Sequence, residues 1–90
     1  MKQYTALTQN MFKHLAQGEE VQYGAFQVKT LEDKIIVRGV FKDGHEAEFH
    51  YRLRRGKEAG FSKEQFKNIF ASREKPLFTI NIRSRQSARA

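Results

Sequence analysis

A group of basic side chains in the second half of the chain has the chemistry of a phosphate-binding surface. The stretch YRLRRGKEAG, residues 51–60, holds four cations within six positions. Arginine donates hydrogen bonds from a planar fork that fits phosphate, and affinity grows with the number of phosphates that a protein neutralises. With the later cations included, the predicted nucleic-acid-binding residues are Arg52, Arg54, Arg55, Lys57, Lys63, Lys67, Arg83 and Arg85.

The net charge of the chain is concentrated in the same region. The 90 residues carry a net charge of +7. Residues 1–50 contain six Lys and Arg against seven Asp and Glu, whereas residues 51–90 contain eleven against three, a net charge of +8. Such asymmetry indicates an anionic partner, most often nucleic acid. The alternative is a solvated surface on which these arginines pair with carboxylates of the same sheet face.

Residue patterns that would support catalysis or metal binding are weak. His45 and His50 are five residues apart on an expected strand and point to opposite faces, so they do not form the zinc pair of H-E-x-x-H. Glu46 and Glu48 share a strand face, but the cations around them favour solvated ion pairs over acid–base chemistry. We therefore expect no metal, no cofactor and no enzymatic activity.

Aromatic side chains offer a second route to nucleic acid, because every base can stack on a ring. Most of the eight Phe and three Tyr fall on apolar stripes that we expect to form the core. The aromatic residues assigned to the core are Phe49, Tyr51, Phe66, Phe70 and Phe78. Tyr23 and Phe26 straddle a slip in the alternation at Gly24-Ala25, so one of them is expected to be exposed. Tyr23 is the preferred stacking candidate.

The N-terminal third predicts a helix followed by extended structure. Apolar residues recur at helical spacing from Tyr4 to Leu15, with Thr5 as a possible N-cap and Gly18 as a C-terminal stop. We predict a helix over about residues 5–17. The alternation that follows is interrupted by the slip after Tyr23, which predicts either one strand with a bulge or two short strands.

Residues 34–54, KIIVRGVFKDGHEAEFHYRLR, predict a β-hairpin around Asp43-Gly44. A two-residue loop would place Val37 opposite His50. A three-residue loop over Lys42–Gly44 instead places Val37 opposite Phe49, and it also sets an arginine opposite a glutamate on the other face. Two apolar side chains, or two side chains of opposite charge, pair favourably across strands, and a slip of one residue would lose this match. We therefore predict the three-residue loop.

Signals for the start of a second helix surround Ser62, the predicted N-cap. Gln65 lies three residues later and can close a capping box, while Phe61 and Phe66 occupy the two hydrophobic-staple positions. Pro76 predicts that the helix ends near Arg73 or Glu74. The alternating stretch PLFTINIRSR then predicts a last strand.

These elements predict an α+β fold in one small domain over residues 1–85. The expected order is α-β-β-β-α-β, with an antiparallel sheet whose one face is packed by both helices. Residues 86–90 are expected to form a flexible basic tail. The sequence lacks cysteine, a membrane-length apolar run and a signal-peptide pattern, so we expect a cytoplasmic protein without membrane contact.

The sequence thus predicts a small, non-enzymatic protein that contacts the phosphates of DNA or RNA with little sequence readout. An alternative is a phage or mobile-element inhibitor or adaptor, similar in kind to anti-CRISPR proteins, that docks on an acidic protein surface or a nucleic-acid channel. In that case Ile36 and Val40 offer an apolar contact for a partner or a homodimer. A weaker alternative is an RNA-cleaving toxin that uses His50, Arg52 and Arg54.

Overall fold

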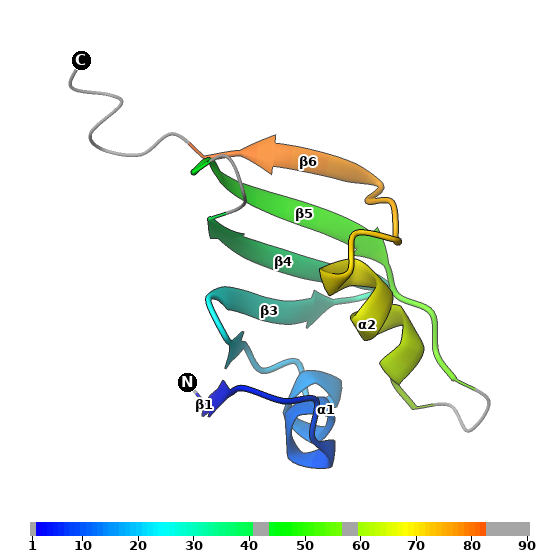
Figure 1. Cartoon of the computed structure of the whole chain (residues 1–90). Helices are drawn as coiled ribbons and strands as arrows, with labels where there is room; N and C mark the ends of the chain where they lie inside the picture. Colours follow the sequence, from blue (N-terminus) through cyan, green and yellow to red (C-terminus); the bar gives the residue numbers. More distant parts are fainter. Residues whose placement is uncertain (1, 41–43, 57–59, 83–90) are drawn as a thin grey trace.

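Six strands form one mixed sheet, and two helices complete the α+β fold (Figure 1). A computed structural model describes residues 2–40, 44–56 and 60–82. Its elements are β1 (Lys2–Tyr4), α1 (Gln9–Ala16), β2 (Val21–Tyr23), β3 (Phe26–Leu31), β4 (Lys34–Val40), β5 (Glu46–Arg52), α2 (Lys63–Phe70) and β6 (Phe78–Asn81). The strands lie side by side in sequence order, with β1 parallel to β2 and the other pairs antiparallel. The predicted order therefore lacks β1 and has three strands between the helices where the structure has four, and the sheet is not antiparallel throughout.

The N-terminal segment begins as a strand and not as a helix. β1 pairs with β2, and the N–H of Gly24 donates to the carbonyl oxygen of Tyr4 at 2.8 Å. α1 starts later because Thr8 is its N-cap, with Oγ1 accepting from the N–H of Met11 at 3.2 Å. The predicted helix over about residues 5–17 was too long at its start. Helical spacing is a local signal, whereas the pairing of β1 depends on a strand that comes much later in the chain.

Two tight turns connect β2, β3 and β4. The slip at Gly24-Ala25 is a turn between two short strands, so the second of the two predicted alternatives is correct. Gly24 has a φ of 60°, which glycine adopts without steric cost. The next turn, Glu32-Asp33, gives Glu32 a φ of 58°. A residue with a side chain adopts that conformation at a cost, so this turn is a strained point of the fold.

The β4–β5 hairpin has the predicted register. Val37 lies opposite Phe49 and Ile35 opposite Tyr51, so the apolar residues of both strands share one face. The loop residues 41–43 lie outside the described part of the chain. Gly44 has a φ of 76°, which fits the left-handed position that ends a three-residue loop.

α2 begins at the predicted cap, but its first turn differs from the expected capping box. Ser62 Oγ accepts from the N–H of Gln65 at 3.2 Å, and the rings of Phe61 and Phe66 meet edge to face at 6.3 Å, as the hydrophobic staple predicts. The Gln65 side chain does not close the box, because it is buried and bonds to the backbone after β5 instead. The helix ends at Phe70, before the predicted end.

The buried side chains of both helices form one cluster with one face of the sheet. From α1 the cluster takes Met11, Phe12 and Leu15, and from α2 it takes Phe66 and Ile69. We call the sheet face that joins this cluster the covered face; its buried residues are Val21, Val28, Ile35, Val37 and Tyr51. Within the described residues, neither helix is long and apolar enough to cross a bilayer.

The opposite side of the sheet, here the open face, carries the alternate residues of the same strands. Register and alternation place on it Gln27, Lys29, Leu31, Lys34, Ile36, Arg38, Val40, Glu46, Glu48, His50, Arg52, Phe78 and Ile80. Phe78 was predicted for the core, and this prediction is wrong: it pairs with His50 and is 43% exposed, while Ile80 is 45% exposed. The alternation of the last strand separates two faces, but it does not say which of them the helices cover.

Candidate nucleic-acid interface

The structure separates the basic residues that the sequence brought together. Arg52 lies on the open face, whereas Lys63 and Lys67 lie on α2. The Lys63 ammonium is 6.0 Å from the ring of Phe12, on the side of the helices. Lys57, Arg83 and Arg85 lie outside the described residues. A single continuous surface that includes the last two residues therefore stays a prediction.

Two of the predicted phosphate ligands have partners within the protein. Arg54 Nη2 lies 2.6 Å from Glu74 Oε1, and the Glu74 side chain is only 10% exposed. This pair offsets the charge of Arg54, whose side chain remains 55% exposed. The Arg55 guanidinium lies over the ring of Phe61, 5.3 Å from its centroid, which anchors the segment between β5 and α2.

Gln65 holds the end of β5 in place. Its Oε1 accepts from the N–H of Arg54 at 2.9 Å, and its Nε2 donates to the carbonyl oxygen of Arg52 at 2.5 Å and to Glu74 Oε2 at 3.3 Å. The amide of Gln65 therefore fixes the backbone that carries Arg52. At the neighbouring Tyr51, burial, and secondarily the Glu74 carboxylate, raises the pKa of the phenol, so the phenol stays protonated.

Three cations on the open face form the best candidate for a phosphate site. Lys34 and Arg52 lie directly opposite each other on β4 and β5, and Lys29 lies on the neighbouring β3. We call Lys29, Lys34 and Arg52 the cationic end of the open face. Among the described residues, none of these three takes part in an ion pair. The predicted hairpin register already implies that Lys34 meets Arg52, but the sequence reasoning did not use it.

An aromatic pair lies beside the cationic end. The rings of His50 and Phe78 stack with their centroids 4.3 Å apart and their planes at 21°. His50 is only 8% exposed, and its Nε2 lies 2.7 Å from Glu48 Oε1. The Lys34 ammonium lies 5.0 Å from the centroid of the Phe78 ring. An exposed ring thus lies next to Lys34, and Arg52 lies opposite Lys34 on the neighbouring strand.

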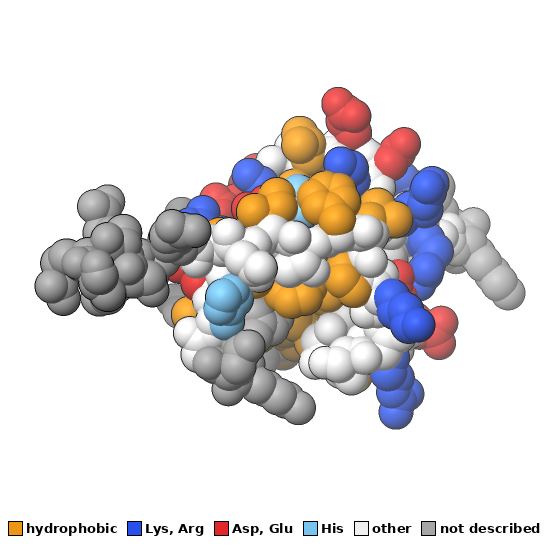
Figure 2. Space-filling model, turned by 90° about the horizontal axis from the view of Figure 1, so that it is seen from above, with side chains coloured by type: hydrophobic (Ala, Val, Ile, Leu, Met, Phe, Trp, Pro, Cys, Tyr) orange, Lys and Arg blue, Asp and Glu red, His pale blue; other side chains and the backbone are white. Residues whose placement is uncertain are grey.

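The view onto the β6 edge shows how these side chains are distributed (Figure 2). Hydrophobic side chains lie in a row along this edge of the sheet, and several Lys and Arg side chains gather toward one end of it. The strongly exposed hydrophobic residues of the described chain include Leu77, Phe78 and Ile80, which come from β6 and the segment just before it.

Tyr23, the predicted stacking residue, belongs to the packed side of the molecule. Its ring lies 4.7 Å from that of Phe70 on α2, and it packs against the buried cluster. Phe26 packs against the same ring at 5.7 Å. These contacts occupy part of both rings, and the stacking role of Tyr23 stays a prediction.

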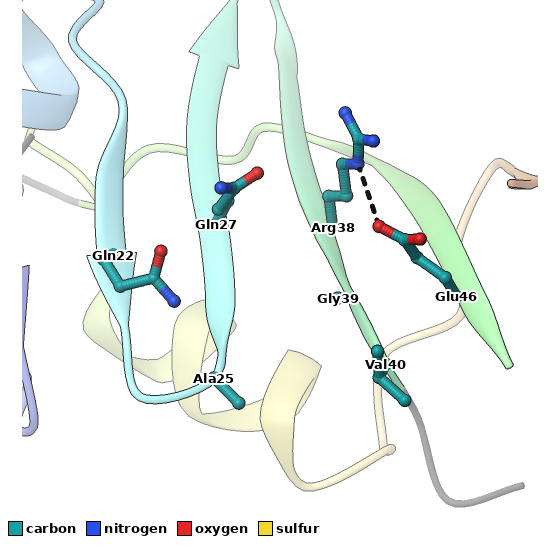
Figure 3. A pocket seen from close by; sticks show the side chains of 7 residues that line it. All are labelled: Gln22, Ala25, Gln27, Arg38, Gly39, Val40 and Glu46. Carbon is teal, nitrogen blue, oxygen red and sulfur yellow. Dashed lines mark ion pairs between the residues drawn. The ribbon is translucent and has the colours of Figure 1, made fainter. Parts of the chain in front are cut away.

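A shallow pocket of about 300 Å³ lies at the other end of the open face (Figure 3). It is lined by Gln22, Ala25, Gln27, Arg38, Gly39, Val40 and Glu46. Arg38 Nε lies 3.5 Å from Glu46 Oε2, so the charges of this pair offset each other. The glutamine amides supply polar groups, but this end lacks the excess of positive charge found around Lys34.

Several weaker predictions meet a specific obstacle in the geometry. The buried ring of His50 and the Arg54–Glu74 ion pair leave Arg52 as the free member of the proposed ribonuclease set. Of the proposed dimer contact, Val40 is 56% exposed but Ile36 is only 4% exposed.

No group of three or more His, Asp or Glu in the described part of the chain is arranged to hold a metal ion.

Comparison with protein-family models, with curated proteins and with solved structures yields no match for this chain. A function can therefore be inferred only from the arrangement of the chain's own residues.

Proposed function

We propose that this protein is a small, non-enzymatic nucleic-acid-binding protein that contacts phosphates through the cationic end of its open face. The observation that carries the proposal is the position of Lys29, Lys34 and Arg52 on adjacent strands of a face that the helices leave uncovered. Charge of this density attracts a polyanion, and each neutralised phosphate adds affinity through counterion release. The overall charge of +7 strengthens this attraction at longer range.

The flat geometry of the site fits an extended ligand. Neighbouring strands are roughly 4.8 Å apart, so the face from β3 to β6 measures roughly 14 Å across. The carboxylates of Glu32 and Asp33 lie in the turn next to Lys34 and reduce the local field. Contacts to the phosphate backbone carry little sequence information, so we expect weak discrimination between sequences.

The double variant Lys34→Ala/Arg52→Ala tests this proposal by fluorescence anisotropy with labelled oligonucleotides over a range of salt concentrations. Loss of two phosphate contacts should weaken binding and lower the slope of log affinity against log salt by about 1.4 on a single strand. Lys63→Ala/Lys67→Ala is the matched control, because it removes the same charge from α2. Equal losses in both variants would show that only total charge matters, and the proposal would be wrong.

A second candidate is docking on another protein as an inhibitor or adaptor. The exposed apolar side chains Leu31, Val40 and Ile80 on the open face favour this candidate. Capture of partners from nuclease-treated lysate distinguishes the two. A protein partner that is retained after nuclease treatment and lost in Ile80→Lys would favour docking, whereas partners that disappear with the nucleic acid would favour the first proposal.

A further inference from the structure

We infer that the preferred ligand is a single strand, and that one of its bases stacks on the outer face of Phe78. This inference rests on the proposed function and specifies the ligand of the same site. It follows from three features: the side of the ring that faces away from β5, the support behind the ring and the cations close to it.

One face of the Phe78 ring is directed away from the sheet. His50 belongs to β5 and stacks almost parallel on the side of Phe78 that faces β5. The other side of the ring therefore points beyond β6. Since β6 is the last strand in the described sheet order, no described strand covers that side. The 43% exposure of Phe78 agrees with this geometry.

The ring is held in this position from behind. His50 is almost fully buried, and its contact with Glu48 Oε1 at 2.7 Å fixes the orientation of the imidazole. Phe78 stacks on that fixed ring, so it has less freedom than an isolated surface phenylalanine. A ligand that uses a preorganised ring loses less conformational entropy on binding.

The cations beside the ring suit a nucleotide better than an apolar peptide. The Lys34 ammonium lies over the Phe78 ring, 5.0 Å from its centroid, and Arg52 lies opposite Lys34 on the next strand. A base on the ring would place its own phosphates near these two charges. Stacking on exposed aromatic residues next to a cationic groove is how proteins bind single strands without sequence preference.

A duplex cannot use the same contact. Its bases are stacked on one another, and their faces are closed to a side chain at the edge of a sheet, whereas the bases of a single strand are free to turn outward. We therefore expect oligothymidylate to bind more tightly than a duplex of the same length, although the duplex carries more charge.

The experiment measures fluorescence anisotropy with an oligothymidylate of about a dozen nucleotides, within the range bound by single-strand platforms, and with a duplex of equal length. Phe78→Leu keeps an apolar side chain but removes the ring, and it should weaken single-strand binding by roughly 5- to 150-fold. It should change duplex binding little. Phe78→Trp should restore single-strand binding, and Ile80→Ala, on the same strand and face, should leave it within about twofold.

The outcomes separate this inference from the proposed function. If salt-dependent binding persists and requires Lys34 and Arg52, but Phe78→Leu binds single strands as well as the parent, stacking is wrong and the proposed function stands. If neither oligonucleotide binds, both fail. Dimerisation that disappears in Phe78→Leu, without oligonucleotide binding, would overturn the inference in favour of contact between two copies of the chain.

Discussion

The two faces of the sheet differ in packing and composition although they come from the same strands. The covered face meets α1 and α2 through fully buried side chains such as Val28, Ile35 and Phe66. The open face also has a buried centre, at Ile36 and His50, but it is bordered by cations and exposed apolar groups. The covered face therefore accounts for most of the stability, and the open face is the one that we propose for ligand binding.

The largest effect on stability is expected from truncation on the covered side. Phe66→Ala removes a fully buried ring that contacts Phe12 edge to face at 5.0 Å, and it should lower the free energy of unfolding by about 3–5 kcal/mol. Phe78→Ala on the open face should cost only about 1 kcal/mol, because much of that ring is already in water. Urea denaturation measures both values. Similar losses for the two variants would mean that the open face is part of the core.

A smaller loss of stability is expected from replacing Gln65, whose amide connects α2 to the end of β5. Gln65→Leu leaves the carbonyl of Arg52 and the N–H of Arg54 without their partner, and it should cost about 2 kcal/mol of stability. It should also weaken nucleic-acid binding, because it loosens the backbone that positions Arg52.

Gln22→Leu provides the matched control for this amide. Gln22 donates to the carbonyl of Gly24 at an exposed site at the edge of the open-face pocket, so its loss should change stability by no more than about 0.5 kcal/mol. If Gln65→Leu proved as mild as this control in urea denaturation, Gln65 would not be what fixes the end of β5.

The smallest effect is expected at the strained turn beside the cationic end. Glu32→Asn should raise the free energy of unfolding by about 1 kcal/mol, since asparagine tolerates the φ of 58° better than glutamate does. It should also strengthen nucleic-acid binding slightly, because it removes a carboxylate near Lys34. Glu32→Gln removes the same charge without relieving the backbone, so it should improve binding alone. Thermal unfolding and anisotropy, run side by side, separate the two contributions.

Local signals in the sequence were sufficient for the hairpin and for the start of α2. The Asp43-Gly44 signal and the apolar match of Val37 with Phe49 define the register, and Ser62 caps the helix as predicted. Both features depend on neighbours that are close in sequence. β1 was missed because its partner strand lies some twenty residues away, and residues near Tyr4 also fit a helical spacing.

The candidate site was harder to predict than the fold because it depends on which face is covered. The sequence separates the two faces of β6, but only the packing of the helices decides that Phe78 is outside and Tyr23 inside. Likewise, the charge of Arg54 is evident in the sequence, while its neutralisation by Glu74, twenty residues later, depends on the fold. Lys34 was overlooked because it lies in the half of the chain with no excess charge.

An NMR titration of the ¹⁵N- and ¹³C-labelled protein with oligothymidylate tests the proposed binding face most directly. We expect the largest shifts on the open face, at Lys34, Arg52 and the ring of Phe78, and no response from the surface of α2 around Lys63 and Lys67. Shifts centred on α2, or no shifts at ligand concentrations that saturate the anisotropy signal, would contradict this expectation.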